Sequence, residues 1–209
     1  GTATDFSARR LAGIVLKIGC CPLILFADAP AKRLVEYGWD RPDPAFARDH
    51  VREMERRPFD GVVMRIPGHG LAFDGSAWSE RALAPHAEAL REIAWERFRG
   101  NFLILNATAE GGLDWLDEAR WETIERNLRM LSRAAGGGRL AGIAFDPEPY
   151  GWSPWTFPPV GAGASLSFPE VEEAVRRRGA QFLSALRSGM PDLDLLMLFG
   201  LGIFDRSID

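Results

Sequence analysis

The stretch LAGIAFDPEPY, residues 140–150, places an acidic cluster directly after a short apolar run. Residues 140–145 carry no polar side chain, which is the pattern of a strand that is covered on both faces of a parallel sheet. Four similar runs predict further strands at residues 33–37, 61–66, 101–107 and 193–199. The sequence therefore predicts a parallel sheet of five strands.

Helical stretches separate these runs. They are predicted at residues 44–57, 79–98, 121–135 and 169–188. Strands that alternate with helices are typical of βα units, so we expect an α/β fold, a parallel (β/α) TIM-type barrel. An eight-stranded barrel takes ~250 residues, so residues 32–209 are predicted to be its N-terminal portion, truncated after about five strands. A doubly wound open sheet is the alternative, although Tyr37-Gly38-Trp39-Asp40 follows the first strand in place of a glycine-rich phosphate loop.

Residues 1–31 have the order of a secretion signal. Arg9 and Arg10 precede an apolar run at residues 11–26, and Ala29-Pro30-Ala31 supplies a small-x-small exit before residue 32. The apolar run is too short to span a membrane. We therefore predict a signal peptide and a mature protein that is secreted or periplasmic in a bacterium, without a membrane anchor. A first buried strand or hairpin is the alternative interpretation.

Composition narrows the possible partners. The chain has 209 residues, a net charge of -4 and a pI near 5.5, so it lacks the basic footprint of a nucleic-acid-binding protein. Cys20 and Cys21 would leave with the signal peptide, so no thiol chemistry is expected of the mature chain. His50, His69 and His86 lack the spacing of metal ligands. We expect neither a metal nor another cofactor, and the sequence leaves the oligomeric state open.

The residues that follow the predicted strands are the candidates for a site, because barrel enzymes carry their active sites at the carboxyl ends of the strands. Asp146 and Glu148 are two apart in an extended segment and so point to the same side. Two carboxyl groups held close together do not ionise independently, so one of them can donate a proton at neutral pH. Aromatic and polar side chains around them suit a sugar, which has apolar ring faces and hydroxyl groups. We predict Glu148, Asp146 and Tyr150 as catalytic residues, and Glu36, Tyr37, Trp39, Asp40, Arg65, Asn106, Trp152 and Trp155 as substrate-binding residues.

The segment Gly142-Ile143-Ala144-Phe145-Asp146-Pro147-Glu148-Pro149-Tyr150 resembles the fourth-strand motif of family 18 glycoside hydrolases, D-G-x-D-x-D-x-E. Ala141 and Ala144 stand at the positions of the first two aspartates of that motif. The resemblance implies hydrolysis of the glycosidic bonds of a polysaccharide or glycan, with Glu148 as proton donor and Asp146 steadying an N-acetyl group of the substrate. Residues 36–40 and 58–61 also resemble uncharacterised exported bacterial barrel proteins.

Other interpretations of the same residues remain open. Glu148 could be the acid/base of a two-carboxylate glycosidase whose nucleophile comes from a seventh strand. A non-catalytic carbohydrate-binding barrel would use the same aromatic and acidic mouth. A purely structural reading pairs the acids with Arg65, bonds Asn106 to neighbouring strands and uses Trp152 and Trp155 to pin their loop. The run Arg176-Arg177-Arg178 is predicted to be a solvated helix end.

Overall fold

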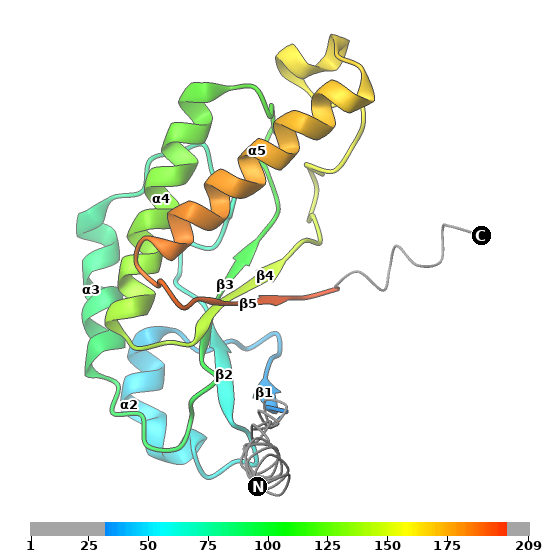
Figure 1. Cartoon of the computed structure of the whole chain (residues 1–209). Coiled ribbons are helices and arrows are strands. Elements are labelled where there is room, and N and C mark those ends of the chain that lie inside the picture. Colours follow the sequence, from blue (N-terminus) through cyan, green and yellow to red (C-terminus); the bar gives the residue numbers. More distant parts are fainter. Residues whose placement is uncertain (1–31, 200–209) are drawn as a thin grey trace, which may run out of the picture. The chain divides into compact units, whose positions relative to one another are not determined.

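The computed structural model describes residues 32–199, so the predicted signal peptide and both cysteines lie outside the described part of the chain. Five parallel strands form one sheet, and four α-helices alternate with them (Figure 1). The elements are β1 (Val35–Glu36), α2 (Pro44–Met54), β2 (Gly61–Met64), α3 (Glu80–Glu92), β3 (Phe102–Asn106), α4 (Glu118–Gly137), β4 (Gly142–Asp146), the 3₁₀ turn η1 (Gly161–Ser165), α5 (Phe168–Arg187) and β5 (Asp194–Met197). All five predicted strands are confirmed, each with its bounds shifted by no more than two residues.

The strands follow one another in the sheet in the same order as in the chain, β1-β2-β3-β4-β5. Every crossover therefore moves in the same direction, and the sheet curls into a half-barrel with α2, α3 and α4 on one side of it (Figure 1). A doubly wound sheet reverses its strand order at a switch point. Since the described strands show no reversal, the doubly wound alternative is wrong for them.

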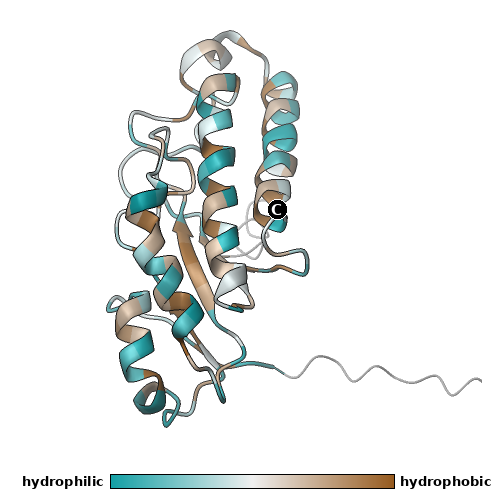
Figure 2. Cartoon of the chain, turned by 90° about the vertical axis from the view of Figure 1, so that its left-hand side faces the viewer, coloured by the Kyte–Doolittle hydropathy of each residue, from teal (hydrophilic) through white to brown (hydrophobic). Residues whose placement is uncertain are grey.

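Side chains alternate between the two faces of the sheet, as the period of a strand requires. The convex face packs on the helices and holds most of the core, including Leu103, Leu105, Ile143 and Phe145. Figure 2 looks onto the helix layer, with the hydrophobic strands (brown) behind it. The concave face carries a smaller apolar group, which we call the concave cluster: Val35, Val63, Phe102, Ile104, Ala141, Ala144, Leu196 and Leu198.

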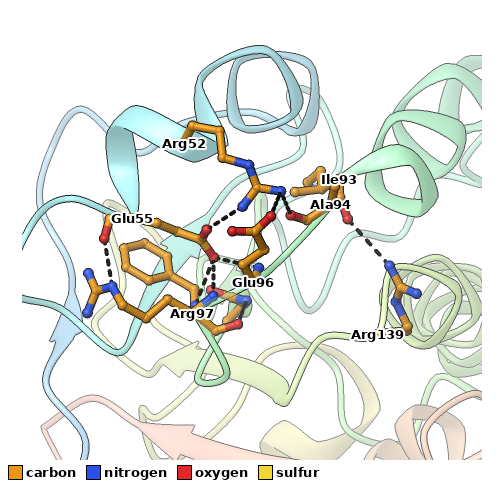
Figure 3. Close-up of polar contacts among 9 residues, drawn as sticks. Arg52, Glu55, Ile93, Ala94, Glu96, Arg97 and Arg139 are labelled. Atoms are coloured by element: carbon orange, nitrogen blue, oxygen red, sulfur yellow. Dashed lines mark hydrogen bonds and ion pairs between the residues drawn. The ribbon is translucent and has the colours of Figure 1, made fainter.

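The second predicted helix, at residues 79–98, ends earlier than predicted, because α3 stops at Glu92 and residues 93–98 form a loop. The carboxylate of Glu55, which is 8% exposed, explains this difference (Figure 3). Its Oε1 accepts the backbone N–H groups of Glu96, Arg97 and Phe98 at 2.9, 2.7 and 2.9 Å. Those N–H groups are thus bonded to a side chain from α2's end and not to helical carbonyls. The prediction of helix over residues 93–98 is wrong for this reason.

Helix α4 is longer than predicted at both ends. The Asp117 side chain caps its start by accepting the N–H of Arg120, and the helix continues through Gly136 as far as Gly137. A Cβ on Gly136 would lie 2.2 Å from the carbonyl oxygen of Gly189, which follows α5. The glycine there permits close packing between the ends of α4 and α5, and it does not stop the helix.

The arginine run on α5 is not a solvated helix end as a whole. Arg178 is only 3% exposed, and its Nη2 lies 2.7 Å from Oε1 of Glu118 on α4. Its guanidinium also lies over the ring of Trp121, with 5.2 Å between the carbon and the ring centroid. The prediction is wrong for Arg178, because α5 turns this residue toward α4 while the two preceding arginines stay exposed. The helices of residues 32–199 include none with the length and hydrophobicity that a membrane crossing demands.

Candidate functional site

Strand alternation directs four of the predicted site residues to the concave side of the carboxyl edge. They are Tyr37, Arg65, Asn106 and Asp146, and each follows a member of the concave cluster by two positions. Asn106 and Asp146 are the last residues of β3 and β4 and are paired in the register of the sheet. Residues from four neighbouring strands are thus aimed at the same side of the half-barrel.

Asp146 is a buried carboxylate, 1% exposed, with a donor on each oxygen. Asn106 Nδ2 donates to its Oδ2 at 3.0 Å, and the backbone N–H of Glu148 donates to its Oδ1 at 3.0 Å. The second bond turns the chain around the carboxylate directly after β4. It therefore determines where Glu148 leaves the edge of the sheet, while Asn106 makes the bond to a neighbouring strand that the structural reading predicted.

Glu148 is exposed, unlike Asp146. The Tyr150 hydroxyl donates to its Oε2 at 3.1 Å. Among residues 32–199, no ion pair joins Glu148 or Asp146 to a basic side chain, so the predicted pairing with Arg65 is not made. Arg65 Nε donates instead to the carbonyl oxygen of Arg41 at 3.4 Å. Glu148 therefore combines solvent access with a single side-chain donor.

Tyr150 stays protonated beside the two acids. Desolvation, the hydrogen bond to Glu148 and the charges of Asp146 and Glu148 all raise the pKa of the Tyr150 phenol above its ordinary value. Tyr37 also raises the pKa of Tyr150, more weakly than these groups. Thr108 Oγ1 accepts the backbone N–H of Tyr150 at 2.9 Å. Thr108 stands among the residues that follow the third predicted strand, but it is not one of the predicted site residues.

Trp155 lies on the loop between β4 and α5 and is held in place on several sides. Its Nε1 donates to the carbonyl oxygen of Pro147 at 2.7 Å, between the two acids in sequence. Its ring centroid lies 6.0 Å from that of Phe73 and 6.1 Å from that of Trp115. Even so, 46% of Trp155 is exposed, so a fixed aromatic surface stands beside Glu148. Trp152, on the same loop, is 58% exposed.

The predicted residues at β1 form a second group. Glu36, Tyr37, Trp39 and Asp40 line one pocket of about 450 Å³. The Oε1 of Glu36 pairs with the guanidinium of Arg57, which lies in the turn after α2. The structure thus places predicted residues in two groups: a pocket at β1, and the acid pair that follows β4, with Asn106 of β3 bonded to Asp146.

Another pocket, of about 530 Å³, lies between the β2–α3 and β3–α4 loops and contains none of the predicted residues. Its Arg120 donates to the carbonyl oxygens of Phe73, Glu110 and Gly112, so this side chain ties the two loops together. Within the described part of the chain, no group of three histidine, aspartate or glutamate side chains is arranged to hold a metal ion. His69 is buried, with its Nδ1 2.8 Å from the Pro67 carbonyl oxygen.

Comparison with models of protein families finds no match, and comparisons with curated proteins and with solved structures find none either.

Proposed function

We propose that this chain carries the acid/base site of an exported, glycoside-hydrolase-like (β/α)8 barrel, and that the half-barrel is the first part of that barrel. One observation carries the proposal: an exposed Glu148 is anchored to a buried Asp146 at the carboxyl edge of a curled parallel sheet. Barrel enzymes carry their chemistry at this edge. The fold alone does not assign a function, so the proposal depends on these two acids and on the aromatic surface beside them.

In the proposed reaction, Glu148 donates a proton to the glycosidic oxygen as the bond to the anomeric carbon breaks. Water then adds to that carbon and gives a proton back to Glu148, so that two free hydroxyl groups replace the glycosidic bond. Its exposure gives the substrate access, and the Tyr150 hydroxyl on Oε2 orients the carboxyl group so that Oε1 faces the leaving oxygen. The exposed ring of Trp155 offers a stacking surface to the apolar face of a sugar. Nothing in this arrangement needs a basic side chain beside Glu148.

Asp146 is proposed to act as a positioning residue, because its 1% exposure keeps it behind Glu148. Its hydrogen bond to the Glu148 N–H orients the acid, and its negative charge favours the positive charge that develops on the sugar. The family 18 motif has an aspartate where Ala144 is buried in the concave cluster. Asn106 supplies the second donor to Asp146 in this chain.

Turnover of glycans tests the proposal. The full-length protein and its Glu148→Gln variant are assayed on a panel of chitin, cellulose and xylan oligosaccharides. We expect the variant to lose about 10²–10⁴-fold of the rate, which is the usual contribution of a general acid. Glu110→Gln is the matched control, since Glu110 is an exposed glutamate in the loop after the neighbouring strand β3 and its carboxylate has no part in the proposed chemistry. Equal turnover by wild type and Glu148→Gln would contradict the catalytic role.

A non-catalytic carbohydrate-binding barrel is the second candidate. The exposure of Tyr150, Trp152 and Trp155 on one loop favours it, because aromatic surfaces bind sugars without any acid chemistry. It predicts that wild type and Glu148→Gln bind the same oligosaccharides with equal affinity and that neither releases product. Calorimetric titration together with product analysis separates the two candidates.

Export is part of the proposal, with residues 1–31 acting as the signal peptide. Expression of the full-length chain in a bacterium should yield a mature protein outside the cytoplasm that begins at residue 32. Mass spectrometry of the mature N-terminus measures this directly. A cytoplasmic protein that keeps residues 1–31 would contradict it.

A further inference from the structure

The pocket at β1 has properties that its predicted role did not require. It lies between β1, the residues that follow this strand and α2, and Met54 and Val62 give it an apolar wall. Its volume of about 450 Å³ is within the range of small-molecule sites. Trp39 and Tyr37 stand at its carboxyl-edge side, with 86% and 46% of their surfaces exposed.

Two buried polar atoms of this pocket have no hydrogen-bond partner. One is an acceptor, Oε2 of Glu36, whose other oxygen pairs with Arg57. The other is a donor, Nε of Arg41. Leaving such groups unpaired is costly, so a ligand that supplies a partner to either of them is favoured. A hydroxyl group both donates and accepts, and a sugar unit carries several of them.

The exposed tryptophans and tyrosines of residues 32–199 are distributed unevenly. Trp78, Trp115 and Trp121 are buried in the core, with 8%, 4% and 1% of their surfaces exposed. By contrast, all the tryptophans and tyrosines that are at least 46% exposed follow β1 or β4: Tyr37, Trp39, Tyr150, Trp152 and Trp155. Aromatic rings thus lie on both sides of the carboxyl edge, at the pocket and at the acid pair.

We propose that the β1 pocket is a second sugar subsite, which holds a unit of the glycan remote from the bond that Glu148 cleaves. The inference rests on the proposed function and extends it to the substrate class: an oligomeric glycan whose units are uncharged and which occupies both aromatic groups. Glu36 and Arg41 bind hydroxyl groups of the remote unit, and Trp39 stacks on its ring. A disaccharide held at the acid pair does not reach this subsite.

Binding to the inactive Glu148→Gln protein tests this subsite without turnover. Calorimetry compares N-acetylchitobiose, N-acetylchitohexaose and cellohexaose, before and after the further change Trp39→Ala. We expect Trp39→Ala to weaken the binding of a hexasaccharide about ten-fold, as the loss of one stacked aromatic ring predicts. The affinity for the disaccharide should change less than two-fold. Trp39 is almost fully exposed, so its removal leaves the fold intact.

Leu183→Ala is the control, because it removes an exposed apolar side chain from α5, an element that does not line the pocket. Arg41→Met, which removes the unpaired donor, should reproduce the selective loss of hexasaccharide affinity. Equal effects of Trp39→Ala on di- and hexasaccharide, no effect on either, or no binding of either hexasaccharide would each overturn the inference. If turnover is unaffected by Glu148→Gln while the length-dependent loss is observed, the catalytic proposal fails and the subsite stands.

Discussion

Two glutamates at opposite ends of the sheet show how the same side chain serves two purposes. Glu55, beside the amino end, is buried and accepts three backbone N–H groups, while Arg52 pairs with its other oxygen at 2.9 Å (Figure 3). Glu148, beyond the carboxyl end, is exposed and accepts a single hydrogen bond from a side chain, that of Tyr150. Both oxygens of Glu55 are bonded within the protein, whereas only Oε2 of Glu148 accepts a hydrogen bond from a side chain. Its Oε1 is therefore available to a ligand.

The difference follows from the architecture. Loops at the amino end of a parallel barrel connect helices to strands and serve stability, while loops at the carboxyl end are free to carry a site. The Glu55 bonds hold residues 96–98 directly before β3 begins, so their loss should disturb the strands themselves. Changes at Glu148 should leave the fold alone. The following predictions test this contrast between the two ends.

The largest effect on stability is expected at Glu55. Glu55→Ala should lower the free energy of unfolding by about 3 kcal/mol, because it leaves several buried N–H groups and Arg52 without their partner. The matched change Glu148→Ala should cost less than about 0.5 kcal/mol, as is usual for an exposed position. Urea unfolding followed by circular dichroism measures both values. Similar losses of unfolding free energy in Glu55→Ala and Glu148→Ala would contradict the proposed difference between the two ends of the sheet.

Acid should weaken the Glu55 interactions only after it has begun to protonate the ordinary carboxylates of the unfolded chain. Burial by itself raises the pKa of Glu55, but the N–H groups of residues 96–98 and the charge of Arg52 outweigh it and lower the pKa below 4.5. The stabilisation is therefore fully present above pH about 4.5 and is lost as the pH falls through the lowered value. The stability difference between wild type and Glu55→Ala should narrow below that pH. Urea titrations at pH 7, 5, 4 and 3 measure it, and a constant difference would contradict the expectation.

At the carboxyl end, Trp155 and Trp152 offer a comparison between a fixed and a less constrained ring. Trp155→Ala in the Glu148→Gln protein should weaken oligosaccharide binding by about 1 kcal/mol, since its ring is held by Phe73, Trp115 and the Pro147 carbonyl. Trp152→Ala should cost less, because ordering a free ring on binding lowers its contribution. Calorimetric titration of both variants with the same oligosaccharide measures which change lowers the affinity more. A larger effect at Trp152 would show that the fixed ring is not the main contact.

The smallest effect on turnover is expected at Thr108, which supports the site through its bond to the Tyr150 backbone. Thr108→Val removes the acceptor for the Tyr150 N–H and should reduce turnover several-fold, with a stability loss of about 1 kcal/mol. Thr123→Val is a suitable control, because the hydroxyl of Thr123 bonds only locally within α4 and is exposed. A loss of stability without any change of turnover would assign Thr108 a structural role only.

Local patterns in the sequence determined which segments form the strands, and they placed Asp146 and Glu148 at the end of the fourth strand and just past it. Apolar runs and helix caps depend on residues only a few positions apart, so they can be recognised in the sequence without knowledge of the fold. The same patterns failed at residues 93–98, because the partner of that loop is Glu55, some forty positions earlier in the chain.

Only the tertiary structure decided which side chains become partners. Asn106 bonds Asp146 across 40 positions, and that contact buries one acid while the other stays exposed. Arg178 is buried because α5 packs its side against α4, which no feature of the arginine run indicates. Secondary structure reflects interactions between near neighbours, whereas burial and charge pairing arise between segments that only folding brings together, and the candidate site is made of such pairs.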